Sequence, residues 1–430
     1  MFVLLTVAFA LFAGLMTTRL FKLLKLNFPD VTAYLIAGLL VGPYGLGRLG
    51  ISGIGFSSYE AVEHVDVIIN AALGFIAFTI GNEFRLSQLR HTGRQAVVIS
   101  IWEGVSAAVL VDVCLLAVHF ILGDKVLNIP AAITLGAIAA ATAPAATLMV
   151  VRQYKAKGPL TDVLLPVVAL DDAVGLIVFA VSFGIAQAML GGSVSVVSII
   201  MEPLIEIVGS LLLGAAMGAL LTALEKLFFS NSNRLSLTIA FVLMTIGLSG
   251  ISFQIGAVHV SFSTLLVCMM LGTVFCNLCP RSVDIMSRSD RWTAPLFALF
   301  FVVSGAELQL SVFSNLAVIS IGVIYIVARV LGKYFGARFG SAIVHCEPTV
   351  QKYLGFTLAP QAGVALGMCV TASSLGTYEG ALVRNIVLFG VLIYELTGPM
   401  ITKTALTKAG EIQNIESDKT THQRFSVPQG

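Results

Sequence analysis

The stretch "ALDDAVGLIVFA", residues 169–180, places Asp171 and Asp172 side by side within a long apolar run. On insertion scales, one carboxylate at the centre of a membrane-spanning helix costs about 3 kcal/mol, so two adjacent carboxylates need a functional explanation. Neighbouring side chains on a helix point about 100° apart, so one can face a protein partner while the other faces a cavity. If the surrounding chain spans a membrane, the pair predicts a site for ions or protons.

The composition of the chain is that of a membrane protein. Of its 430 residues, 57% are hydrophobic and only 11% are charged, which lies far outside the range of soluble globular proteins. The formal net charge of +2 is too small to indicate nucleic acid as a partner. Among the six cysteines, Cys276 and Cys279 have CxxC spacing, but a single such pair is more typical of packing than of a metal site. The high hydrophobic content thus predicts that the chain is surrounded by membrane lipid.

Apolar runs of helix-spanning length recur along the whole chain. A helix needs about 20 residues to cross roughly 30 Å of hydrocarbon. The runs fall near residues 2–20, 30–47, 65–82, 96–122, 130–151, 161–189, 194–228, 234–252, 256–278, 293–307, 312–341, 350–374 and 381–407. The sequence thus predicts an all-α polytopic membrane protein with about 13 transmembrane helices.

The basic residues alternate between loops and predict the orientation. Cytoplasmic loops carry the excess of Lys and Arg, and such residues gather in every second loop, beginning with Arg85, Arg90 and Arg94. We therefore expect a multi-pass cell (inner) membrane protein with its N-terminus outside and its C-terminus in the cytoplasm. Residues 410–430 are polar and are expected to form a disordered cytoplasmic tail.

Two of the apolar runs contain a proline at mid-span. Pro144 lies in "TAPAAT", residues 142–147, and Pro360 lies in "LAPQAG", residues 358–363. Proline removes a helical hydrogen bond and clashes with the preceding turn, so both helices should be broken. The two breaks correspond if helices 4–6 repeat as helices 11–13, and paired breaks in two repeats are typical of a transporter's binding site. We expect Thr142 and Gln361 to lie there. The alternative, two kinks that only shape packing, stays open.

The carboxylates require a counter-charge, and "YIVARVLGKYFGARFG" supplies Arg329 and Lys333 one helical turn apart. Lys333 is the expected partner of one aspartate, because an ammonium can lose its proton and a guanidinium cannot. Its alternative role is to extend towards the membrane interface. Arg329 is expected to bridge helices. Glu103, Glu307 and Glu395 are candidates for structural or supporting ion pairs.

Several segments resemble the cation/proton antiporter superfamily. "LNFPDVTAYLIAGLLVGPYGLG" (26–47) and "LGFIAFTIGNEFRLSQLRHTGR" (73–94) are followed by "ALDDAVGLI", "RVLGKYFG" and "LAPQAGVALG" in the order of that superfamily. The pattern is most similar to the bacterial sodium/proton antiporter branch of the second cation:proton antiporter family. The resemblance implies inverted repeats with two crossed, broken helices.

The same resemblance implies roles for individual residues. Asp172 would be the ion-binding carboxylate and Asp171 the carboxylate that pairs with Lys333. Na⁺ would bind Asp172 and Thr142 at the crossing of the broken helices. Two acids with one lysine imply electrogenic exchange of cytoplasmic Na⁺, and of Li⁺, for external H⁺. Both ions are transported, and no cofactor is expected.

The resemblance also implies a homodimer in which a mobile core moves against a dimer domain. The expected ranges are 1–95 and 231–310 for the dimer domain, 96–190 and 311–409 for the core ion-transport domain, 191–230 for a linker helix and 410–430 for the tail.

Two alternatives remain at this stage. Ala143 stands before Pro144 where many relatives have an acidic residue, so a K⁺/H⁺ antiporter or K⁺ efflux protein of the same superfamily stays open. An intramembrane aspartyl protease also needs two buried aspartates, but on different helices. The adjacency of Asp171 and Asp172 argues against that enzyme, and we expect a transporter.

Overall fold

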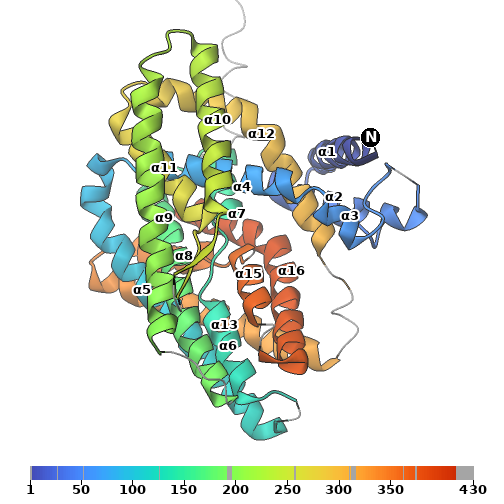
Figure 1. Cartoon of the computed structure of the whole chain (residues 1–430). Helices are drawn as coiled ribbons and strands as arrows, with labels where there is room; N and C mark the ends of the chain where they lie inside the picture. The colour runs from blue at the N-terminus through green and yellow to red at the C-terminus, as the bar shows by residue number, and fades with distance from the viewer. Residues whose placement is uncertain are drawn as a thin grey trace, which may run out of the picture.

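The computed structural model describes residues 2–412, except for 27, 52, 125, 191–195, 256–257, 309, 311–315, 362 and 373–374. The described chain is almost wholly helical (Figure 1). Its helices are α1 (Phe2–Leu23), α2 (Asp30–Val41), α3 (Tyr59–Glu63), α4 (Asp66–Glu83), α5 (Leu86–Leu122), α6 (Ile129–Ala139), α7 (Pro144–Gln153), α8 (Pro159–Met189), α9 (Val196–Glu225), α10 (Asn231–Ser249), α11 (Thr264–Leu278), α12 (Ser282–Glu307), α13 (Leu316–Ile343), α14 (Pro348–Thr357), α15 (Gly363–Ala372) and α16 (Thr377–Lys408), with a 3₁₀ turn at Leu46–Leu49.

Many of these helices are suited to lipid. Within the described residues, nine segments are long and apolar enough to cross a membrane, and two shorter apolar helices, Val67–Asn82 and Thr264–Leu278, accompany them. With α12 and the pair α14–α15, this is compatible with the thirteen predicted spans. Large apolar side chains such as Phe12 and Leu212 are more than half exposed, as expected for surfaces that face lipid rather than water.

One group of helices comprises α1, α2, α4, α11 and α12, which pack on one another. The α2–α12 contact is close because glycines meet backbone there: a Cβ added to Gly38 would lie 2.0 Å from the carbonyl oxygen of Val302. Small residues let membrane helices approach in this way. Helix α9 packs on α11 of this group and also on α8, so it connects the group to the second one.

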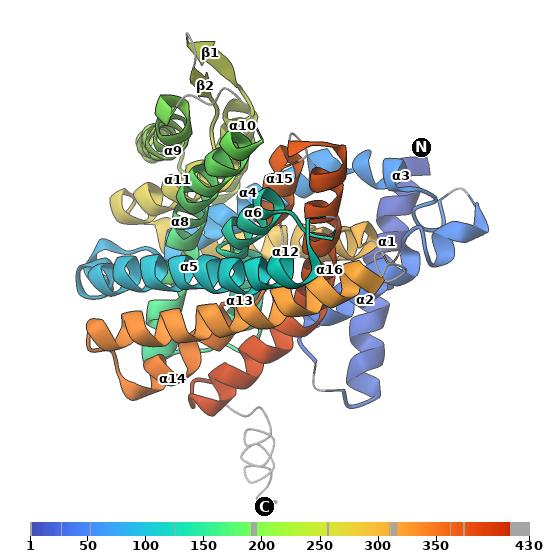
Figure 2. The same ribbon diagram turned by 90° about the horizontal axis from the view of Figure 1, so that it is seen from below.

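The second group contains α5–α8 and α13–α16. Helices α5 and α13 lie side by side over much of their length (Figure 2). Gly332, Gly336 and Gly340 form the contacting face of α13, and a Cβ at Gly336 would come within 2.6 Å of the Glu103 Cα atom. This stripe of small residues, spaced by four, brings the two backbones together and fixes which residues of α5 can face α13.

The two predicted breaks are confirmed. Helix α6 ends at Ala139 and α7 begins at Pro144, while α14 ends at Thr357 and α15 begins at Gly363. The two interruptions meet, because the Ala143 N–H donates to the Pro360 carbonyl over 2.9 Å. Pro144 occupies the first turn of α7, where a missing N–H costs nothing.

The helix predicted over 256–278 is shorter than expected. Helix α11 begins only at Thr264, where the Ser263 side chain accepts from the Leu266 N–H. Before it, β1 (Phe253–Ile255) and β2 (Val258–Val260) form an antiparallel pair. Short apolar runs with β-branched residues fit a strand as well as a helix, and their length does not distinguish the two.

The start of the predicted tail packs against the helical body. Glu411 is buried, and its carboxylate accepts from the Leu160 and Thr161 N–H groups at 2.6 and 2.8 Å. It therefore caps the first turn of α8. The remainder of the expected disordered tail, from residue 413, lies outside the described residues.

Candidate functional site

Arg329, on α13, lies where the two broken helices cross. It is fully buried. Its guanidinium donates to the Ala139 and Ala141 carbonyls at 3.0 and 2.7 Å, and to the Ala359 carbonyl at 2.7 Å. These carbonyls end α6 and α14, so one cation satisfies the unpaired acceptors and the negative dipole ends of both half-helices. The planar guanidinium also lies 4.6 Å from the Tyr394 ring centroid.

Lys333, one turn further along α13, has four acceptors around its ammonium. Nζ lies 2.7 Å from Glu103 Oε2 and 2.9 Å from Asp171 Oδ2. It also lies 2.6 Å from both the Ala140 carbonyl and the Thr142 hydroxyl. The side chain is fully buried, so it does not extend to the membrane interface.

The aspartate pair on α8 has two different environments. Asp171 is fully buried and forms the ion pair with Lys333 through Oδ2. Asp172 is 4% exposed and, among the described residues, forms no ion pair. Oδ1 of both aspartates lacks a hydrogen-bond partner there, so Asp172 differs from Asp171 in having no cation beside it. A buried carboxylate oxygen without a donor costs free energy unless a proton or a cation satisfies it. Asp172 is therefore the group that is chemically open.

Gln361 lies in the second break and is also fully buried. Its amide donates to the Ile138 carbonyl at 2.9 Å and contacts the Tyr325 hydroxyl. Pro360 supplies the carbonyl that accepts from Ala143, and its ring packs beside Gly398 of α16. Gln361 and Pro360 thus tie the second break to the first.

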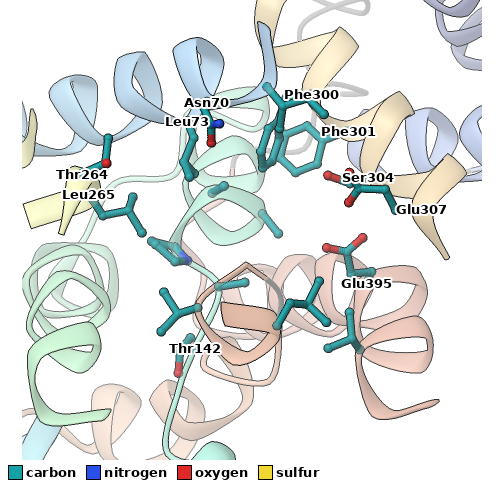
Figure 3. Close-up of a pocket in the computed structure, with 18 of the residues that line it drawn as sticks. Asn70, Leu73, Thr142, Thr264, Leu265, Phe300, Phe301, Ser304, Glu307 and Glu395 are labelled. Carbon is teal, nitrogen blue, oxygen red and sulfur yellow. The ribbon is translucent and has the colours of Figure 1, made fainter. Parts of the chain in front are cut away.

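A cavity of about 430 Å³ opens between the two groups of helices. Thr142, Ala143 and Pro144 form one end of its lining, and Glu307 and Glu395 lie at its side. Figure 3 shows the last two carboxyl groups facing each other from α12 and α16, with Thr142 further along the wall. The first break is therefore accessible from this cavity.

The structure brings together eight of the nine residues singled out from the sequence: Asp171, Asp172, Thr142, Lys333, Arg329, Pro144, Pro360 and Gln361. Glu395 lines the cavity instead of touching this cluster. The sequence indicated Glu103 only as a candidate for a supporting pair and did not give its partner, which is Lys333. The signal that could have found it is the glycine stripe "LGKYFGARFG", residues 331–340, since such a stripe requires a closely packed partner helix.

Comparisons with known proteins identify the family and the fold. The family described as "Sodium/hydrogen exchanger, transmembrane" matches residues 7–408. The structure of the sodium proton antiporter MjNhaP1 from Methanocaldococcus jannaschii at pH 8 is similar, with a TM-score of 0.65 and 18% identity over 94% of this chain and 100% of that one.

The electron microscopy map of the same antiporter gives a TM-score of 0.68 at 16% identity, covering 95% of this chain and 98% of that one. At these identities the similarity establishes the fold alone. No curated protein sequence matches the chain. Because the family match covers nearly the whole chain, the protein is a membrane transporter that belongs to the sodium/hydrogen exchanger family.

Proposed function

We propose that this protein exchanges cytoplasmic Na⁺, and Li⁺, for external H⁺ through Asp172. The observation that carries the proposal is one buried carboxylate without a cationic partner among the described residues, Asp172, beside the ion pair of Asp171 and Lys333 at the crossing of two broken helices. MjNhaP1, which has a similar fold, is named as a sodium proton antiporter, and this supports Na⁺ and H⁺ as the two exchanged ions. The transported ions are substrates, and the mechanism needs no cofactor.

Competition for one carboxylate would couple the two fluxes. Asp172 can hold a proton or a cation, but one occupant excludes the other. A hydroxyl oxygen has two lone pairs, so Thr142 can accept from Lys333 and still offer a ligand to Na⁺. Hard cations prefer such oxygen ligands, with water completing the shell. The proposed sodium ligands are therefore Asp172 and Thr142.

Alternating access would come from motion between the two groups of helices. We assign residues 96–190 and 311–409 to the moving core, residues 1–95 and 231–310 to the dimer domain of a homodimer, and residues 191–230 to the linker. The cavity beside Thr142 lies between these groups. By the predicted topology, with the N-terminus outside, the end of α12 and Glu307 lie towards the external side. Protons would then reach Asp172 through this cavity.

Electrogenic exchange follows from the charge count in the proposal. If Asp171 and Asp172 each take up one proton for the return step while one Na⁺ leaves from Asp172, two positive charges move inward for every one that moves outward. A cytoplasmic-membrane exchanger of this kind would serve sodium extrusion and pH homeostasis.

The test uses purified protein in liposomes loaded with a pH-sensitive dye, to which Na⁺, Li⁺ or K⁺ is added in turn. A sodium response that changes with a clamped membrane potential supports electrogenic exchange. If only K⁺ gives a response, the potassium/proton alternative replaces the proposal. If the sodium response is independent of potential, exchange stands and electrogenicity fails. Empty liposomes with the same gradients are the control.

A further inference from the structure

Glu103 is a carboxyl group in the interior that the proposed exchange does not yet use. It lies on α5, its side chain is 0% exposed, and its Oε2 approaches Lys333 Nζ to 2.7 Å. Burying an additional carboxylate is costly unless it has a specific partner. The Lys333 ammonium is that partner.

The donor count at Lys333 separates the roles of its two acids. A protonated lysine has three N–H donors, whereas Nζ has four acceptors within hydrogen-bonding distance: Glu103, Ala140, Thr142 and Asp171. One acceptor is therefore in surplus at any moment. If Asp171 leaves, Glu103, the Ala140 carbonyl and the Thr142 hydroxyl still satisfy all three donors. If Glu103 leaves, Asp171 is the one carboxylate among the described residues that still lies within hydrogen-bonding distance of the ammonium.

Helix packing indicates that Asp171 is the acceptor that Lys333 can lose. Glu103 and Lys333 are carried by α5 and α13, whose backbones are in contact through Gly332 and Gly336. Their ion pair is thus built into a close helix contact. Asp171 comes from α8, which packs mainly on α5 and α6. Its contact with Nζ is also the longest of the four, at 2.9 Å.

We propose that Glu103 is the positioning residue of Lys333: it is the standing counter-ion that keeps the charged ammonium at the helix crossing, so that Asp171 can leave it during the exchange. This inference rests on the proposed function and deepens it. It also changes one expectation from the sequence, because Lys333 does not need to lose its proton when its pair with Asp171 opens.

The first test is a pair of double-mutant cycles read by thermal unfolding of the purified protein. Lys333→Gln leaves Glu103 and Asp171 without a cation and should lower the midpoint of unfolding. Adding Glu103→Gln should recover most of that loss, and adding Asp171→Asn should recover less. Additive effects of the Glu103 and Lys333 changes, or an equal or larger recovery with Asp171→Asn, would overturn the proposal.

This cycle does not depend on transport. An absent sodium response in liposomes would therefore end the proposed function and leave the thermal result unaffected. Conversely, additive unfolding data would remove the role of Glu103 from a protein that still exchanges ions. The two failures are thus distinguishable.

The second test measures exchange in liposomes. In Glu103→Gln the ammonium keeps Asp171 as its only counter-ion, so the maximal rate should fall by about tenfold, while the sodium concentration for half-maximal rate stays within about twofold. Glu103→Asp retains the charge and should restore part of the rate. Glu60→Gln, an exposed carboxylate on α3, is the control. A wild-type rate in Glu103→Gln, or no recovery in Glu103→Asp, would contradict the assignment.

Discussion

The segment α5–α8 and the segment α13–α16 have the same plan but opposite buried charges. Each consists of a long helix, a pair of half-helices and a second long helix; the half-helices have 11 and 10 residues in the first segment and 10 and 10 in the second. The first segment contributes the buried acids Glu103, Asp171 and Asp172, and the second contributes the buried cations Arg329 and Lys333. Neither segment is electrically balanced in the interior without the other.

The difference shows how a repeated shape can carry one binding site. In both segments a half-helix ends at the crossing with unpaired carbonyls, yet the cation that satisfies them comes only from α13. The acids of α5 and α8 then meet cations that already serve the backbone. The fold and the proposed ion site therefore depend on the same two side chains, and substitutions in the two segments should have different consequences.

The largest expected effect is on transport, and it comes from replacing an acid of the first segment. Asp172→Asn keeps the size of the side chain but removes the carboxylate that we propose binds Na⁺ and H⁺ in turn. Sodium-driven proton flux in liposomes should fall to the level of empty vesicles, with the unfolding midpoint unchanged or raised, because a buried charge is removed. Flux equal to that of the wild type would show that Asp172 is not the exchange group.

The largest expected effect on stability comes from replacing a buried cation of the second segment. Arg329→Gln leaves carbonyls of both breaks without donors, and each unsatisfied buried acceptor costs about 1–3 kcal/mol. We expect a loss of at least about 3 kcal/mol in the free energy of unfolding, measured by denaturation in detergent.

Arg338→Gln is the matched control on the same helix. Arg338 is exposed and donates to the Tyr334 hydroxyl one turn away, so its loss should change stability by no more than about 0.5 kcal/mol. Equal effects of the two substitutions would remove Arg329 from its role at the crossing.

The sequence predicted the local features of this site and the pairing of Lys333 with an aspartate, but not the contact between Lys333 and Glu103. Pro144 and Pro360 mark both breaks because proline excludes helical backbone whatever surrounds it. Asp171 stands out because an acid in an apolar run is costly in any fold. The contact of Glu103 with Lys333 depends instead on how α5 turns against α13, which is decided by packing between helices distant in sequence.

A smaller effect is expected where the two segments touch. Gly336→Ala places a methyl group 2.6 Å from the Glu103 Cα atom, so α5 and α13 must separate, and Glu103 must move from Lys333. Overpacking of this kind costs about 1–3 kcal/mol. Gly247→Ala on α10, where nothing lies within 4 Å of the added carbon, is the control and should stabilise by about 0.5–1 kcal/mol. Unfolding of both variants under the same conditions checks the difference; a stabilised Gly336→Ala would contradict the close contact.

The smallest expected effect tests a second connection between the segments. Glu411 follows α16 of the second segment, yet its carboxylate accepts from the Leu160 N–H, the Thr161 N–H and the Thr161 hydroxyl in the first turn of α8, the helix of the aspartate pair. Glu411→Gln keeps an acceptor but removes the charge that complements the helix N-terminus, so we expect a loss of about 1 kcal/mol.

Glu347 provides the comparison within the other segment. It stands at the N-cap of α14 without a side-chain hydrogen bond to that helix, so Glu347→Gln should change the free energy of unfolding by a few tenths of a kcal/mol at most. If Glu411→Gln and Glu347→Gln change the free energy of unfolding by the same amount in denaturant, the Glu411 contact does not stabilise α8. If Glu411→Gln also slows exchange while Glu347→Gln does not, then the end of the second segment helps to hold the acids of the first at the crossing, because α8 is the only element that the Glu411 carboxylate contacts among the described residues.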